Sequence, residues 1–198
     1  MKVAVVVLAA GGSRRLGRPK QLLGYRGATL LDAVLTTARQ TPAGQLLVTL
    51  GAAADEIRAA VDLSGAEVAD TPDYGRGCAS SIRSALARLR PDLDGLVLLL
   101  GDQPGVSADA VHRLCAEAGR AAMGVCRYDD GRGHPLWFHR RMFEALRGLH
   151  GDKAVWKLLE AADDQDVVEV RVPGRVPPDV DTWEDYEALL EQDRQAVR

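Results

Sequence analysis

A loop rich in glycine and positive charge follows the first apolar run of the chain. Residues 10–20 read Ala-Gly-Gly-Ser-Arg-Arg-Leu-Gly-Arg-Pro-Lys. Backbone N–H groups in such turns, together with lysine and arginine side chains, can bind the negative oxygens of a phosphate chain. An ordinary glycine turn with solvated arginines is the alternative interpretation. We expect a phosphate-binding loop.

The glycine spacing excludes two common phosphate-binding motifs. A dinucleotide fingerprint requires Gly-x-Gly-x-x-Gly, whereas the glycines here stand at positions 11, 12 and 17. A Walker P-loop would fit Gly12 and Gly17, but Arg18 and Pro19 stand where a lysine and a serine or threonine are needed. Pro19 also has no N–H to offer.

Carboxylates occur at two further places where a metal could bind. Asp102 comes directly after the apolar residues 96–100, at the carboxyl end of an expected strand, where open α/β sheets bind ligands. It could instead cap the next helix, but Ser107 is better placed to do so. Asp179 and Asp181 precede the last expected helix, and Asp179 also suits a plain turn. Because Mg²⁺ prefers oxygen ligands, we predict a Mg²⁺ site formed by Asp102 and an acid of this second segment.

Alternating strands and helices must position these residues. Apolar runs typical of buried strands occupy residues 2–10, 45–50, 66–69, 96–100, 123–127 and 167–172. Amphipathic stretches of helical length occupy residues 30–39, 53–61, 79–90, 108–119, 140–149, 153–161 and 183–192. Thr29 and Thr182 each stand three residues before an aspartate, as helix N-caps do. The pattern predicts one α/β domain.

Residues 129–133, Asp-Asp-Gly-Arg-Gly, separate two β-like runs. They are typical of a hairpin turn, which predicts at least one antiparallel strand. Neither a repeat nor a flexible linker divides the chain. We expect the domain to cover residues 1–192, followed by a polar C-terminal tail over residues 193–198.

Composition and charge narrow the class of protein. The chain has 198 residues, 46% hydrophobic and 27% charged, which excludes disorder, collagen-like repeats and coiled coil. Its apolar runs are far shorter than the about 20 residues of a membrane span, and we expect a cytoplasmic protein without membrane contact. Three widely spaced cysteines predict neither disulfides nor a zinc site. Residues 1–31 contain six cations and no acid, which indicates a local anionic ligand rather than nucleic acid.

These segments together resemble the MobA-like nucleotidyltransferases, and among them the molybdenum cofactor cytidylyltransferases. The family's opening signature is Leu-Ala-Ala-Gly-x-Ser-x-Arg-hydrophobic-Gly-x-x-Lys. It is matched by Leu8, Ala9, Ala10, Gly11, Ser13, Arg15, Leu16, Gly17 and Lys20. The resemblance spans nearly the whole chain and continues through residues 71–74 (Thr-Pro-Asp-Tyr), 77–81 (Gly-Cys-Ala-Ser-Ser) and 133–135 (Gly-His-Pro).

The resemblance implies a fold and an activity. The fold is a single three-layer, Rossmann-like α/β domain with a mostly parallel, twisted sheet, related to the GT-A nucleotide-diphospho-sugar transferases. The activity is the Mg²⁺-dependent transfer of a nucleotide, CMP from CTP, to a phosphorylated acceptor such as molybdopterin, with release of pyrophosphate. A molybdoenzyme or its chaperone would receive the product.

The resemblance also assigns residues to roles. Arg15 and Lys20 would hold the triphosphate, and Asp102 and Asp181 would hold the magnesium ion. The acceptor would bind at Gly133, His134, Pro135 and Asp152. The nucleotide-binding residues would be Leu8, Ala9, Ala10, Gly11, Gly12, Ser13, Arg15, Lys20, Gly77, Ser80, Ser81 and Asp102. Because the family's guanylyltransferases usually have glycine at the position of Ala10, its methyl group predicts a preference for CTP over GTP.

Two positions depart from the family pattern. Thr71 stands where the family usually has asparagine. Trp156 stands where the family's Gly-Asp-x-Gly-Ala-Arg has the arginine that would meet an anionic acceptor. Trp156 also suits a core position on a helix, and His134 also suits a structural histidine.

Other functions fit the sequence less well. A glycosyltransferase would require Asp-x-Asp directly after the central strand, where this chain has Gly101-Asp102-Gln103. The glycine spacing counts against a nicotinamide-dependent oxidoreductase. A nucleotide-binding regulator without catalysis is the remaining alternative, and the two candidate metal carboxylates argue against it.

Overall fold

A seven-stranded sheet lies at the centre of the computed structural model, which describes residues 1–196. The strand order is β5-β4-β1-β6-β8-β7-β9. The strands are β1 (Val3–Ala9), β4 (Gln45–Leu50), β5 (Glu67–Asp70), β6 (Gly95–Leu100), β7 (Met123–Arg127), β8 (Arg132–His139) and β9 (Val167–Arg171). Two short strands, β2 (Gly24–Tyr25) and β3 (Ala28–Thr29), form a separate antiparallel ribbon. Each predicted strand occurs.

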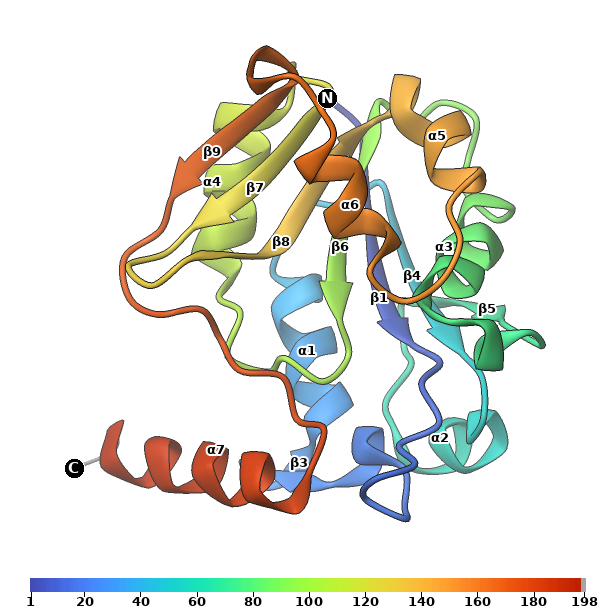
Figure 1. Cartoon of the computed structure of the whole chain (residues 1–198). Helices are drawn as coiled ribbons and strands as arrows, with labels where there is room; N and C mark the ends of the chain where they lie inside the picture. The colour runs from blue at the N-terminus through green and yellow to red at the C-terminus, as the bar shows by residue number, and fades with distance from the viewer. Residues whose placement is uncertain (197–198) are drawn as a thin grey trace.

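The sheet is mostly parallel, and β8 is its antiparallel strand. β8 pairs antiparallel with both β6 and β7, and the other pairs in this sheet are parallel. The turn into β8 is closed by the N–H of Tyr128, which donates to the carbonyl of Gly131 at 2.8 Å. The predicted hairpin is therefore confirmed. Because β1, β4, β5 and β6 run in the same direction, their carboxyl ends lie at one edge of the sheet, in the lower half of Figure 1.

Helices cover both faces of the sheet, as Figure 1 shows. The helices are α1 (Leu30–Arg39), α2 (Ala54–Ala60), α3 (Cys78–Leu86), α4 (Ala108–Ala118), α5 (Phe143–Arg147), α6 (Ala154–Glu160) and α7 (Trp183–Ala196). The core on one face joins β1 to α1, α2 and α4, and the core on the other joins it to α3, α5 and α6. Alternate side chains of β1 enter the two cores, which explains its unbroken apolar sequence. The three-layer α/β fold is confirmed.

Short-range hydrogen bonds begin several helices where the sequence predicts them. Thr29 and Asp32 form a reciprocal capping box at α1. Thr182 Oγ1 accepts from the N–H of Asp185 at 3.2 Å before α7. Ser107 Oγ accepts from Ala110 N–H and caps α4. Asp102 is therefore not needed as the cap of α4.

The last helix extends past its predicted end at residue 192. α7 continues to Ala196, so residues 193–196 of the expected polar tail are helical, and residues 197 and 198 lie outside the described part. The extension has a physical cause, because Arg26 Nε donates to Asp193 at 2.7 Å and ties the helix to the β2–β3 ribbon. Within residues 1–196, no helix is both long and apolar enough to cross a bilayer.

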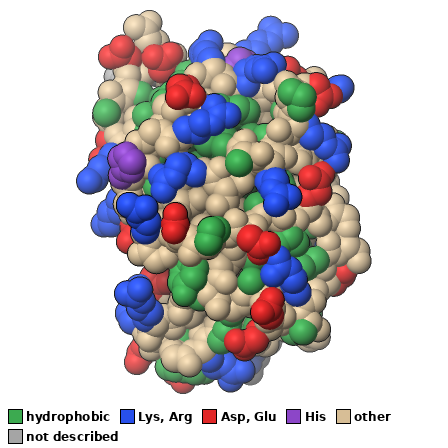
Figure 2. Space-filling model, turned by 90° about the vertical axis from the view of Figure 1, so that its right-hand side faces the viewer, with side chains coloured by type: hydrophobic (Ala, Val, Ile, Leu, Met, Phe, Trp, Pro, Cys, Tyr) green, Lys and Arg blue, Asp and Glu red, His purple; other side chains and the backbone are tan. Residues whose placement is uncertain are grey.

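The surface over α3 and α5 carries mixed charge. Figure 2 shows lysine and arginine side chains interspersed with aspartate and glutamate on this face. A surface that binds a nucleic acid backbone usually presents a continuous basic stripe. The face seen in Figure 2 has no such stripe.

Candidate functional site

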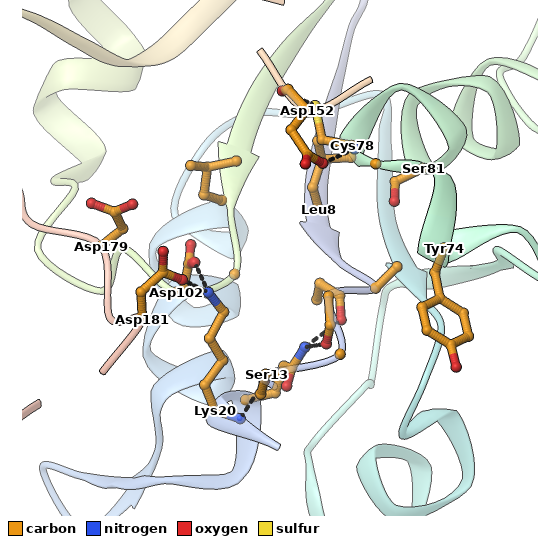
Figure 3. Close-up of a pocket in the computed structure, with 18 of the residues that line it drawn as sticks. Leu8, Ser13, Lys20, Tyr74, Cys78, Ser81, Asp102, Asp152, Asp179 and Asp181 are labelled. Carbon is orange, nitrogen blue, oxygen red and sulfur yellow. Dashed lines mark hydrogen bonds and ion pairs between the residues drawn. The ribbon is translucent and has the colours of Figure 1, made fainter. Parts of the chain in front are cut away.

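A cavity of about 670 Å³ opens at the carboxyl ends of β1 and β6. Five chain segments that are distant in sequence contribute to its wall, as Figure 3 shows. The predicted site residues that line it are Leu8, Ala9, Ala10, Gly11, Gly12, Ser13, Arg15, Lys20, Gly77, Ser81, Asp102, Asp152 and Asp181. The sheet thus brings the glycine-rich loop, the acid after β6 and the acids before α7 to one place.

The loop after β1 folds back on itself around Ser13. Ser13 has a φ of 49°, and its carbonyl accepts from the N–H groups of Leu16 and Gly17 at 3.1 and 3.2 Å. Its hydroxyl accepts from the N–H of Lys20 at 2.9 Å. Gly17 has a φ of 68°, a conformation that glycine adopts without strain. The hydroxyl of Ser13 therefore holds the end of the loop, so that Lys20 points into the cavity (Figure 3).

The predicted cations and the predicted metal ligands form one cluster. Lys20 pairs with both Asp102 and Asp181, and its Nζ lies 2.6 Å from Oδ1 of Asp181. Arg15 approaches the other oxygen of Asp181, also at 2.6 Å. The side chains of Lys20 and Asp102 are only 13% and 15% exposed, so solvent screens their interaction weakly. Opposite charges are concentrated in a partly buried space.

Burial and ion pairing act in opposite directions on these groups. Burial disfavours the charged amine of Lys20, but the carboxylates of Asp102 and Asp181 outweigh it and raise the pKa of Lys20. Burial also disfavours the charge on Asp181, yet Lys20 and Arg15 outweigh it and lower the pKa of that carboxyl. At Asp102 burial dominates and raises the pKa despite Lys20. Asp102 therefore depends on a nearby cation to keep its charge.

The acids at this edge offer the type of ligand that a divalent metal ion prefers. Asp102, Asp179 and Asp181 all line the cavity, and Figure 3 shows their carboxylates on the same side of it. Mg²⁺ and Mn²⁺ both favour carboxylate oxygens. Among the described residues, however, no group of three or more acids, histidines or cysteines is arranged to hold a metal ion, and the amine of Lys20 contacts both Asp102 and Asp181. The metal site at Asp102 and Asp181 therefore stays a prediction.

The other end of the cavity is formed by the start of α3 and the α5–α6 loop. The N–H of Cys78 donates to Oδ1 of Asp152 at 3.2 Å, and the N–H of Ala79 donates to the carbonyl of Gly151 at 3.3 Å. Gly77 precedes the helix with a φ of 95°, and a Cβ there would lie 2.6 Å from Asp152 Oδ1. Asp152, predicted at the acceptor, thus uses one oxygen to cap α3.

Some predicted site residues lie away from the cavity wall. Ser80 donates its hydroxyl to the carbonyl of Gly77 at 2.6 Å and is not part of the lining. The predicted acceptor residues Gly133, His134 and Pro135 belong to β8 and do not line the cavity either. The structure therefore does not bring this part of the predicted acceptor site to the charged cluster.

His134 has a structural environment. It is 6% exposed, and its ring lies edge-on to Trp156 with the centroids 5.5 Å apart. Burial lowers the pKa of His134 from 6.5 to about 4, so the ring is neutral at pH 7. Trp156 packs against the core between the sheet and α3. His134 is thus buried in the core, whereas Trp156 is partly buried and packs against it.

Nine lining residues were not predicted as site residues, and among them Gln21, Tyr74 and Cys78 have polar side chains. Tyr74 and Cys78 belong to stretches that resembled the family, which was the available signal. Gln21 had none, because a glutamine beside a lysine usually indicates a solvated turn. Thr71, the departure from the family pattern, is 2% exposed and does not line the cavity.

Solved structures and curated relatives resemble this chain. Rv0371c from Mycobacterium tuberculosis is 50% identical with a TM-score of 0.91, covering 96% of this chain and 98% of that chain. A structure of Rv0371c in complex with manganese is 49% identical, with a TM-score of 0.87, and covers 96% of this chain and 99% of that chain.

Two curated relatives are less similar to this chain, one because its identity is lower and the other because it matches a shorter part of the chain. The purine catabolism protein PucB of Bacillus subtilis is 29% identical over 198 residues, 93% of this chain and 94% of PucB. Nicotine blue oxidoreductase of Paenarthrobacter nicotinovorans is 33% identical over 142 residues, 68% of this chain and 69% of that protein.

A match to the sequence model of a family, over most of the domain, shows the family of this chain. Residues 5–167 match the sequence model of the MobA-like NTP transferase domain. The matched range contains the loop after β1, Asp102 and the start of α3, and it ends before Asp179 and Asp181. The cluster of cations and carboxylates thus combines residues inside and outside the matched range. This chain belongs to the family of proteins with a MobA-like NTP transferase domain.

Proposed function

We propose that this chain transfers a nucleotide from a nucleoside triphosphate to a phosphorylated acceptor and releases pyrophosphate. The observation that carries the proposal is the cluster in the cavity, where Arg15 and Lys20 meet Asp102 and Asp181. A triphosphate with its metal ion carries the complementary set of charges. Membership of the MobA-like family supports the same reaction class.

The reaction is a displacement at phosphorus. An oxygen of the acceptor's terminal phosphate attacks the α-phosphorus, the bond to the bridging oxygen of the β-phosphate breaks, and pyrophosphate leaves with that electron pair. The attacking phosphate is already ionised at neutral pH, so no side chain needs to remove a proton. Arg15 and Lys20 neutralise the charge that develops on the leaving pyrophosphate.

Asp102 and Asp181 would hold the metal, with Asp179 beside them. A bound Mg²⁺ or Mn²⁺ would supply positive charge to the phosphate oxygens in the transition state. The manganese in the structure of Rv0371c, at 49% identity, supports a divalent cation here. Asp102 lies in the turn two residues after the buried strand β6, so the rigid strand would help it to hold its position while the ligands change.

The substrate pair that we infer is CTP and molybdopterin. The inference rests on the resemblance of the opening signature and on Ala10, which lines the cavity directly after β1. A molybdoenzyme or its chaperone would then accept the product. One carboxylate oxygen of Asp152 accepts from the N–H of Cys78 at the start of α3. Its second carboxylate oxygen would therefore make the contact with the acceptor.

The relatives suggest a second candidate of another class. The name of nicotine blue oxidoreductase, 33% identical over 142 residues, describes a redox enzyme. A reductase using a nicotinamide cofactor would need to bind a pyrophosphate without the Gly-x-Gly-x-x-Gly spacing, and it would not need paired carboxylates at the same point. These two features favour nucleotidyl transfer.

A direct assay separates the two candidates. The protein is incubated with each of the four ribonucleoside triphosphates and Mg²⁺ or Mn²⁺, with and without molybdopterin, and pyrophosphate is measured. Parallel samples contain NADH or NADPH with an electron-accepting dye. We expect pyrophosphate from CTP only when molybdopterin is present. Oxidation of the nicotinamide without any release of pyrophosphate would overturn the proposal in favour of the reductase.

A further inference from the structure

Gln21 is a buried polar residue of the cavity wall that the proposed chemistry does not use. It lies in the short 3-10 helix η1 (Lys20–Leu22), is 2% exposed and lines the cavity. Its Nε2 donates to the carbonyl of Ala9 at 2.7 Å and to the carbonyl of Gly11 at 3.1 Å. These carbonyls stand on either side of Ala10, where β1 becomes the glycine-rich loop.

The amide of Gln21 is only partly hydrogen-bonded. Oε1 of Gln21 is buried without a hydrogen-bond partner among the described residues. A buried polar atom without a partner destabilises the folded state and offsets part of the stabilisation that the two Nε2 hydrogen bonds supply. The amide at this place therefore acts through its donor groups, which hold two backbone carbonyls.

Holding a carbonyl also orients the N–H of the same peptide group. The peptide bond is planar and trans, so its C=O and N–H point in opposite directions. Because Gln21 binds the carbonyl of Gly11, the N–H of Gly12 must point away from Gln21. Within residues 1–196, this N–H donates to no backbone carbonyl. Gly12 itself lines the cavity, and a backbone N–H without an acceptor in a loop of this kind can donate to an anionic ligand.

Two residues of this turn, Lys20 and Gln21, hold different parts of the loop. The N–H of Lys20 is bound by Ser13 Oγ, and the side chain of Gln21 binds Ala9 and Gly11. The loop is therefore held at both its beginning and its middle by one short helical turn. The charged end of Lys20 reaches the carboxylate cluster from the same turn.

We propose that Gln21 is a positioning residue for the nucleotide, because it orients the Gly11–Gly12 peptide so that the N–H of Gly12 can donate to a phosphate oxygen. The proposal rests on the nucleotidyl transfer inferred above. Gln21 touches neither the metal nor the reacting atoms in this role. It acts through the backbone of the loop.

The test compares Gln21→Met with a matched control, Gln45→Met. Gln45 is 3% exposed, and its Nε2 likewise donates to two acceptors, Oε2 of Glu67 and the carbonyl of Arg88, both at 2.9 Å. It begins β4, at the opposite edge of the sheet, and does not line the cavity. Both substitutions remove a buried amide, so both should lower the Tm. Only Gln21→Met should affect the loop.

Two measurements decide the role of Gln21. The ¹⁵N order parameters of Gly11 and Gly12, measured by NMR relaxation without any nucleotide, should fall in Gln21→Met and not in Gln45→Met. The Kd for CTP with Mg²⁺, measured by calorimetry, should rise about tenfold, as expected for one lost charge-assisted hydrogen bond. In turnover the KM for CTP should rise, whereas the KM for the acceptor should not.

A second variant separates the effect of the lost hydrogen bonds from the effect of changed packing. Gln21→Leu also lacks the donors but has a different shape, and it should match Gln21→Met in both measurements. Order parameters and CTP affinity at parental values in either folded variant would overturn the role of Gln21. If the parent protein binds none of the four triphosphates, the proposed function fails and so does the phosphate contact. Lower order parameters of Gly11 and Gly12 confined to Gln21→Met and Gln21→Leu would then still show that Gln21 orders the loop.

Discussion

At the scale of single residues, Asp102 is the group on which the proposed reaction most depends. It lies in the turn two residues after the buried strand β6, is not needed as the cap of α4 and pairs with Lys20. We expect Asp102→Ala to lower pyrophosphate release by on the order of 10²-fold or more, because the metal supplies several kcal/mol of transition-state stabilisation. Lys20 keeps Asp181 as its partner, so the fold should survive, which circular dichroism can check. Turnover close to the parental rate at low Mg²⁺ would contradict the assignment.

Arg15 and Lys20 can be compared with Arg26, a cation of the same basic segment outside the cluster. Arg26 is bound to Asp193 on α7 and does not line the cavity. Replacing Arg15 or Lys20 by alanine should weaken triphosphate binding by about 1.5–3 kcal/mol, the range for a hydrogen bond to a charged group. Arg26→Ala should leave the Kd for CTP nearly unchanged. Equal losses in all three variants, measured by calorimetry, would indicate a diffuse electrostatic field.

Ala10 carries the prediction about the base. It is 3% exposed and lines the cavity between the two carbonyls that Gln21 holds. If its methyl group lies beside the base, a purine must press against it, and a clash of this size is worth about 1–3 kcal/mol, or roughly ten- to two-hundred-fold in kcat/KM. We expect CTP to be preferred over GTP by that ratio, and Ala10→Gly to reduce the preference. An unchanged ratio would place base selection elsewhere, such as at residues 77–81.

At the scale of elements, the docking of the α5–α6 loop onto α3 depends on Gly77. Its φ of 95° and ψ of 175° lie in a region that only glycine occupies readily, and an added Cβ would meet both Gly151 and Asp152. We expect Gly77→Ala to destabilise the protein by about 1–3 kcal/mol and to raise the KM for CTP, because the start of α3 must move. Thermal unfolding and kinetics measure the two effects.

A control for this change is Gly148→Ala in the same loop. Gly148 has an ordinary φ of −75°, and the nearest atom to its added Cβ would be 3.5 Å away. Alanine should therefore be tolerated there, with little change in Tm or in KM. If Gly148→Ala and Gly77→Ala had the same effect, the close approach of Gly77 to Asp152 would not be the cause.

At the scale of the whole molecule, His134 makes the stability of the domain depend on pH. Burial lowers its pKa to about 4 in the folded protein, against 6.5 ordinarily. Between these values the unfolded chain binds more protons, so stability falls as the pH falls from 6.5 to 4. The shift corresponds to a loss of about 3 kcal/mol, since one pKa unit is about 1.4 kcal/mol.

Urea unfolding at several pH values tests this dependence. His134→Phe keeps an aromatic ring against Trp156 but cannot be protonated. The difference in unfolding free energy between the parent and His134→Phe should therefore change by about 3 kcal/mol between pH 7 and pH 4. Two parallel pH profiles would mean that His134 accepts a proton without disturbing the core.

Local patterns determined most of the fold. The apolar run that became β1, the capping pair Thr29 and Asp32, and the turn before β8 each depend on neighbours close in sequence, so their structure could be predicted. The end of α7 could not, because Asp193 is held by Arg26, which lies 167 residues away along the chain. A local pattern carries no information about a partner so distant.

The candidate site, like the fold, could be predicted from the sequence only in part. The sequence by itself indicated a phosphate-binding loop and a metal-binding acid after a buried strand, and its resemblance to a known family selected Arg15, Lys20, Asp102 and Asp181. Tertiary structure decided which groups meet: it brought Arg15 to Asp181 across 166 residues, tied Asp152 to the start of α3, and left His134 in the core. It also buried Gln21 against the backbone of the loop. A residue type states what chemistry is available, whereas burial and partners, which arise only on folding, decide whether that chemistry is used.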